Sequence, residues 1–176
     1  MGSRWCRSRV KPRCLQLMRW PTTPRLRRGG GQRHRHLWSL FVPDDIVIQK
    51  LASIDRCLAA VRRYVANDFN RLDDPMVLDA VVLNLQRACE LAIDAACREV
   101  SRLRLGVPSD SADAFVVLQQ QAVLSSAVAE RMRRMVGFRN IAVHEYRRLD
   151  PAIVRTVVAE RLGDFEALCR ELLTGT

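Results

Sequence analysis

The chain has 176 residues, of which 48% are apolar, 6% aromatic and 27% charged, and its formal net charge is +10. This length gives room for the core of one ordinary domain, and scarce aromatic residues, Gly and Pro favour packed helices over a sheet. No apolar run approaches the roughly 18–20 residues that span a bilayer, which excludes a membrane-spanning protein.

The positive charge is concentrated at the N-terminus. Residues 1–41 contain eleven Lys or Arg and no acidic residue, whereas residues 42–176 contain eighteen basic and nineteen acidic residues. The second part therefore has a net charge of −1. A local patch can still bind RNA there, but overall charge is no argument for it.

Residues 1–41 combine scattered arginines with a Gly triplet and no hydrophobic periodicity, so we predict a disordered tail. Its basic start lacks the apolar segment of a signal peptide. One interpretation is an RNA-binding arm in which Trp5, Trp20 and Trp38 stack on bases. The favoured interpretation is an upstream start assigned in error, with translation starting at Val42, because the tail contributes nothing to a core.

Hydrophobic periodicity predicts helices throughout residues 42–176. The first helix has apolar residues at alternating spacings of four and three: Val47, Leu51, Ile54, Leu58, Val61 and Val65. A polar connection over 67–74 leads to a second helix from about Pro75 to Leu103, since Asp74-Pro75 provides an N-cap and a first-turn proline.

Further helices are predicted over about 111–122 and 126–142, and a last one opens at Asp150-Pro151 and continues through Leu172. No stretch alternates with period two for long enough to predict a strand. The predicted fold class is all-α, a bundle of four or five helices.

The six cysteines form no CxxC pair, and Cys57, Cys89 and Cys97 fall in helical patterns where a thiol acts as a small hydrophobe. His144 is the only histidine of residues 42–176. We therefore predict no metal site and expect a reducing, cytoplasmic environment.

The segment 135–146 concentrates residues suited to phosphodiester chemistry. His144 is the side chain best able to take and return a proton near neutral pH. Arg139 is a permanent cation whose fork of donors matches phosphate oxygens, and Tyr146 adds a phenol. A base, a cation and a phenol within eight residues indicate a site for attack on a phosphodiester.

Helix geometry restricts how these residues meet. On a continuous helix Asn140 and His144 share a face, whereas Arg139 and His144 point about 140° apart. Either the helix loosens between them, or the substrate occupies a groove that both flanks reach. His144 and Tyr146 face the same way only in an extended stretch. We therefore place the helix end close to His144, at the rim of a cleft.

The spacing of these three residues resembles the R-x4-H-x-Y motif of HEPN-domain toxins of the HepT type. It consists of Arg139, four intervening residues, His144, one further residue and Tyr146. The surrounding RRMVGFRNIAVHEY, the earlier LNLQRACELAIDAA and the GVP break before the third helix are also similar to that family. The resemblance covers about residues 43–173 and leaves the tail unmatched.

The resemblance implies an antiparallel HEPN-type bundle that acts as a homodimer, with Arg and His of two protomers lining one cleft. It implies a metal-independent endoribonuclease without a cofactor, acting on mRNA or tRNA. His144 would deprotonate the ribose 2′-OH, which leaves a 2′,3′-cyclic phosphate and a 5′-OH. Arg139 would stabilise charge on the phosphorane, and Asn140 would position the phosphate or the imidazole.

The resemblance also implies a partner. Toxins of such type VII toxin–antitoxin systems are neutralised by an MntA-like nucleotidyltransferase, which transfers AMP from ATP to the hydroxyl that matches Tyr146. Each AMP would place a bulky anion beside Arg139.

Charged residues near the motif allow two interpretations. Glu90 and Asp94, four apart in the second predicted helix, either orient the catalytic side chains or are simply exposed. The basic residues form either a solvated face or RNA contacts beside the cleft. They are Arg131, Arg133, Arg134, Arg147 and Arg148.

The sequence thus leaves three hypotheses. The preferred one is a ribonuclease toxin. The second is a non-catalytic HEPN module that partners a nucleotidyltransferase and only accepts AMP on Tyr146. The third is an RNA-binding protein that acts through residues 1–41, whose affinity would depend strongly on salt and disappear with the tail.

Overall fold

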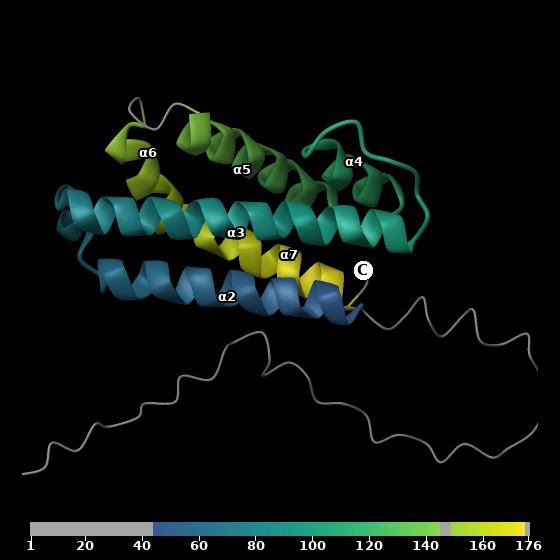
Figure 1. Ribbon diagram of the computed structural model, residues 1–176, viewed down its shortest axis with the longest axis horizontal. Coiled ribbons are helices and arrows are strands. Elements are labelled where there is room, and N and C mark those ends of the chain that lie inside the picture. Colours follow the sequence, from purple (N-terminus) through teal and green to yellow (C-terminus); the bar gives the residue numbers. More distant parts are fainter. Residues whose placement is uncertain (1–43, 145–148, 175–176) are drawn as a thin grey trace, which may run out of the picture.

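The computed structural model describes residues 44–144 and 149–174, and within these ranges it contains helices and no strand (Figure 1). The elements are α2 (Asp45–Val65), α3 (Pro75–Arg102), α4 (Asp113–Gln120), α5 (Ser126–His144), α6 (Pro151–Thr156) and α7 (Leu162–Thr174). The predicted all-α bundle is confirmed. The predictions for the tail, Tyr146, Arg147 and Arg148 fall outside the described residues.

Helix α2 begins and ends at the signals that the sequence carries. Asp44 caps it by accepting a hydrogen bond from the Ile46 N–H at 3.0 Å, and Ala66 ends it in the left-handed conformation, with φ of 50°. The six apolar residues of the predicted pattern are all buried, none more than 3% exposed. This face is therefore core.

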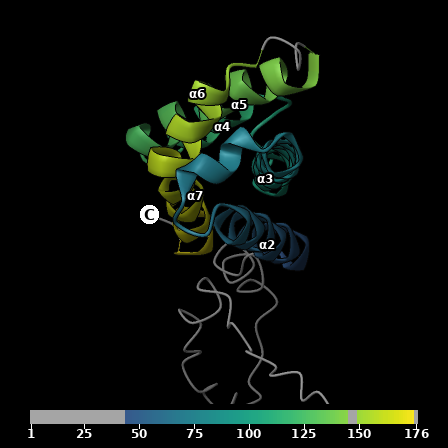
Figure 2. The same cartoon turned by 90° about the vertical axis from the view of Figure 1, so that its left-hand side faces the viewer.

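The connection between α2 and α3 is more structured than predicted. It contains a 3-10 turn, η2 (Phe69–Asp73), which buries Leu72 at 1% exposure. Arg155 of α6 donates to the Phe69 carbonyl at 2.5 Å and pairs with the Asp73 carboxylate. The connection is thereby fixed to the C-terminal part of the chain, as Figure 2 shows.

Helix α3 is the central element of the bundle, in contact with α2, α4, α5 and α7. It runs from Pro75 as predicted and ends at Arg102, one residue before the predicted end. Four of its alanines are at most 2% exposed: Ala88, Ala92, Ala95 and Ala96. Such small side chains let helices approach closely on several sides at once.

The predicted last helix is interrupted. Between α6 and α7 lies a π-helical segment, η4 (Val157–Arg161). Nothing in the hydrophobic pattern marks it, because Val154, Val158, Leu162 and Phe165 are buried at spacings that an uninterrupted helix would also have.

Two acidic side chains are buried among the described residues, and both have a cationic partner. Glu99 pairs with Arg102 at 2.5 Å, within α3. Asp164 of α7, 6% exposed, pairs with Arg131 of α5 at 3.1 Å and so joins the two helices. None of the described helices has both the length and the apolar character needed to cross a bilayer.

Candidate active site

Helix α5 carries the predicted catalytic pair at its C-terminal end, beside α6 (Figures 1 and 2). The helix is continuous from Ser126 to His144, so the backbone does not loosen between Arg139 and His144. His144 is the last residue described before 145–148, and the predicted helix end stays a prediction. Their side chains consequently leave the helix about 140° apart. His144 is exposed, as a base that meets a substrate must be.

Arg139 points from α5 towards α3. Its Nη2 donates to Oε1 of Glu90 at 3.3 Å, and its Nη1 donates to Oδ1 of Asn140 at 3.3 Å. Both distances are at the weak end for charge-assisted hydrogen bonds. Its Nε is buried and has no hydrogen-bond partner among the described residues. A buried donor without a partner costs about 1–3 kcal/mol, so this guanidinium is not placed for stability alone.

The two predicted acidic residues of α3 pair with different cations. Glu90, whose side chain is 42% exposed, binds Arg139 and also accepts from Nε2 of Gln86 at 3.4 Å. Asp94 instead pairs with Lys50 of α2 at 2.8 Å. Glu90 is therefore the carboxylate that contacts the predicted site, and Asp94 helps to join α2 to α3.

The Cys89 thiol lies beside Arg139 but is chemically inert. Burial, with help from the neighbouring Glu90 carboxylate, raises the pKa of Cys89 to about 12 against the opposing effect of Arg139. At neutral pH it stays a thiol, and only the thiolate is a nucleophile or a metal ligand. The four described cysteines form no disulfide with one another, and Cys57, Cys89 and Cys169 are buried like small hydrophobes.

The predicted RNA-contacting arginines of α5 already have carboxylate partners. Arg131 pairs with Asp164, while Arg133 and Arg134 both pair with Glu130, at 3.0 and 3.2 Å. The pairs of Arg133 and Arg134 lie at the surface, where such interactions are weak and exchange readily for a phosphate. An RNA contact by Arg131 or Arg134 stays a prediction.

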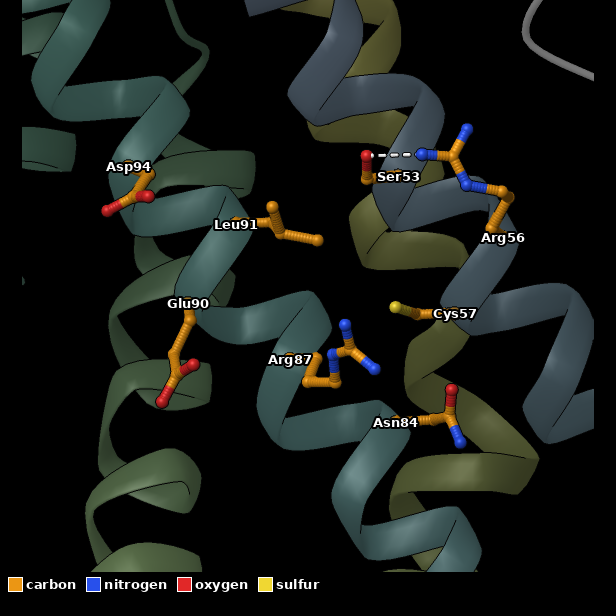
Figure 3. Close-up of a pocket in the computed structure, with 8 residues that line it drawn as sticks. All are labelled: Ser53, Arg56, Cys57, Asn84, Arg87, Glu90, Leu91 and Asp94. Carbon is orange, nitrogen blue, oxygen red and sulfur yellow. Dashed lines mark hydrogen bonds between the residues drawn. The ribbon is translucent and has the colours of Figure 1, made fainter.

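Two features of this region escaped the sequence analysis. Apolar side chains are exposed around the end of α5: Ile141 is 40%, Val143 37% and Ile153 of α6 43% exposed. In addition, a polar groove between α2 and α3 reaches Glu90 and contains Arg56 and Arg87 (Figure 3). Both features combine residues of separate helices, and only the three-dimensional arrangement brings them together.

Comparison with known proteins identifies the family of this chain. The profile of the family described as Ribonuclease HepT-like matches residues 54–172. The mRNA nuclease HepT of Shewanella oneidensis is 39% identical over 123 residues, which cover 70% of this chain and 92% of that protein.

Solved structures show the same fold. The tri-AMPylated HEPN toxin of Shewanella oneidensis, in complex with its MNT antitoxin, is 37% identical, with a TM-score of 0.69. That match covers 73% of this chain and 96% of the toxin. A toxin–antitoxin structure with AMP-PNP is 36% identical, also with a TM-score of 0.69, and the match covers 73% of this chain and 98% of that one. With the profile matched over most of its folded part, this chain belongs to the Ribonuclease HepT-like family.

Proposed function

We propose that this chain is the ribonuclease toxin of a toxin–antitoxin pair and that it cleaves RNA with His144 as general base. The observation that carries the proposal is the placement of Arg139, a half-buried cation held by Glu90 and five residues before the exposed His144 on one helix. The relative named mRNA nuclease supports RNA as the substrate and favours mRNA over tRNA.

The reaction needs no group beyond those of this chain and the RNA. His144 takes the proton of a ribose 2′-OH, and the 2′-oxygen attacks the adjacent phosphorus. The bond from phosphorus to the 5′-oxygen breaks, and that oxygen takes the proton back from the His144 imidazolium, which leaves a 2′,3′-cyclic phosphate and a 5′-OH. Arg139 stabilises the negative charge that builds on the phosphorane oxygens, and Asn140 helps to position the phosphate. Metal independence is part of the proposal.

Glu90 acts as a positioning residue for Arg139. Its carboxylate fixes one arm of the guanidinium at 3.3 Å and leaves the rest of the fork for a phosphate. Because the bond is long and Glu90 is 42% exposed, a phosphate oxygen can share the guanidinium without displacing a buried ion pair.

A second copy of the chain completes the site in this proposal. Arg139 and His144 lie on different sides of α5, and the exposed apolar residues Ile141 and Val143 lie between them in sequence. Covering such residues on a partner gains hydrophobic free energy. A twofold axis at this face brings Arg139 of one protomer opposite His144 of the other.

Neutralisation by AMP transfer is the remaining part of the proposal. The toxin of Shewanella oneidensis is described as tri-AMPylated and in complex with an MNT antitoxin. We assign the acceptor role here to Tyr146, two residues after His144, and the donor role to a cognate MntA-like nucleotidyltransferase. Each AMP added there brings a phosphate to a residue seven positions after Arg139 in the sequence, where it would compete with the RNA phosphate for the guanidinium.

The first prediction concerns the catalytic pair. Purified protein should cleave single-stranded RNA in the presence of EDTA, and His144→Ala or Arg139→Ala should lower the rate at least about 100-fold, because each removes a group that acts in the transition state. Arg170→Ala, which removes an exposed arginine of α7, is the matched control and should keep the rate. Retained cleavage by His144→Ala would remove the mechanism. A wild-type chain that accepts AMP but cuts no RNA would establish the non-catalytic module instead.

The second prediction tests the composite site. In a purified heterodimer of an Arg139→Ala chain and a His144→Ala chain, one of the two sites combines an intact arginine with an intact histidine from the other protomer. Cleavage should therefore return to about half the wild-type rate, whereas either mutant homodimer stays inactive. If arginine and histidine of the same chain worked together, both sites of the heterodimer would be defective and no activity would return.

The third prediction concerns Glu90. Glu90→Gln keeps the size of the side chain but loses the charge that orients Arg139, so kcat should fall about 10–100-fold with little change in KM. Asp94→Asn, the matched control one helical turn away, breaks the pair with Lys50 and should leave kcat unchanged. Equal kinetics of the two variants would show that Glu90 has no positioning role.

The fourth prediction concerns modification. Incubated with the antitoxin and ATP, the wild-type chain should gain the mass of one or more AMP units and lose its RNase activity. Tyr146→Phe should gain no mass and stay active, while Tyr64→Phe, which changes the other tyrosine of the chain, should behave as wild type. Modification of Tyr146→Phe would place the acceptor elsewhere.

A further inference from the structure

A groove between α2 and α3 adjoins the proposed catalytic site. On the α3 side its lining includes Asn84, Arg87 and Glu90, which follow one another at spacings of three and so share one face of the helix. Arg56 contributes from α2. Figure 3 shows the Arg87 side chain extending from α3 towards α2, and the Arg56 guanidinium bonded to Ser53 on α2.

Among the residues that the structure describes, the arginines of this groove have no carboxylate partner, although the groove contains two carboxylates. Glu90 binds Arg139, and Asp94 binds Lys50, so both acids are paired with cations other than the two arginines. Within the described residues, Arg56 donates only to the Ser53 hydroxyl, at 2.7 Å, and Arg87 has no polar partner. Both are exposed. The groove thus offers two available guanidiniums, the group that binds phosphate best.

The groove lies next to the place proposed for the scissile phosphate. Glu90 is at once a wall of the groove and the partner of Arg139. Arg87 precedes Glu90 by three residues, a rise of about 4.5 Å along α3. A single RNA strand whose scissile phosphate lies at Arg139 therefore needs only to cross α3 to bring its neighbouring phosphates to Arg87 and then to Arg56.

Asn84 adds an acceptor for the sugar. Its Nδ2 donates to the Ala80 carbonyl at 2.7 Å, and Figure 3 shows its oxygen directed towards the groove. An amide oxygen beside two phosphate-binding arginines matches the 2′-OH that distinguishes RNA from DNA.

We propose that the α2–α3 groove is a subsite for the RNA backbone, in which Arg56 and Arg87 bind the phosphates of nucleotides next to the scissile one. The inference rests on the proposed ribonuclease function and extends the site beyond the catalytic pair. It also explains how a folded part with nearly balanced charge holds a polyanion, because only local, unpaired cations are needed.

The test measures binding without cleavage. A short, fluorescently labelled, single-stranded RNA of mixed sequence, with its 2′-OH groups intact, is titrated at several salt concentrations with the full chain carrying His144→Ala, which prevents cleavage. Arg56→Gln/Arg87→Gln should weaken binding at least about tenfold at low salt and reduce the slope of log Kd against log salt by about 1.4, since each phosphate contact on a single strand contributes about 0.7. With His144 intact, the same two substitutions should raise KM for cleavage of this RNA more than they lower kcat.

The control is Arg104→Gln/Arg170→Gln, which removes the same charge from two exposed arginines outside the groove and should leave the salt slope unchanged. Thermal unfolding by circular dichroism checks each protein. If the groove double variant does not fold, Arg56→Gln and Arg87→Gln are measured separately, each with an expected slope change of about 0.7.

The outcomes separate the two proposals. If the wild-type chain cleaves RNA but the groove variant binds and cleaves like the control, the subsite is wrong and the ribonuclease stands. Normal RNA binding combined with loss of AMP transfer would also overturn the subsite and identify the groove as an antitoxin contact. If the wild-type chain neither binds nor cleaves RNA, both proposals fail.

Discussion

Close packing around α3 is the constraint on which the rest of the structure depends. Its buried alanines leave room for neighbouring helices on several sides, and α2, α5 and α7 all contact it. Glu90 lies between Ala88 and Ala92 in this helix, so the packing that brings α5 close also brings Arg139 to a carboxylate. A larger residue at these alanines would separate the helices and the ion pair together.

The ion pairs of this fold differ in their burial and in how easily they open. The buried carboxylates of Glu99 and Asp164 have arginine partners, as burial requires. The surface pairs of Arg133 and Arg134 cost little to open. Arg139 differs from both groups, because it is half-buried with long hydrogen bonds and a buried donor that no described residue satisfies. That combination is typical of a group whose best partner arrives with the substrate.

Local signals in the sequence predict much of this fold and place the proposed catalytic pair on one helix. The apolar spacing of 47–65 and the Asp-Pro signals at Asp74 and Asp150 rest on interactions within one or two turns. The 3-10 turn was not predicted, since it is bound by Arg155 from a distant part of the chain, and the π-helical segment was not predicted, because the apolar spacing does not mark it. Likewise, Glu90 and Asp94 share a helix face, and only the placement of Arg139 and Lys50 assigns each its partner.

The start of α2 is fixed to α3, because Asp44 caps α2 and at the same time pairs with Arg98 at 2.7 Å. Figure 1 places this start and the end of α5 at opposite ends of the long axis of the bundle. A fluorescent protein or affinity label joined ahead of Asp44 would thus be attached far from His144. The start of α2 is therefore the better point at which to immobilise the protein in single-molecule or surface-based RNA measurements.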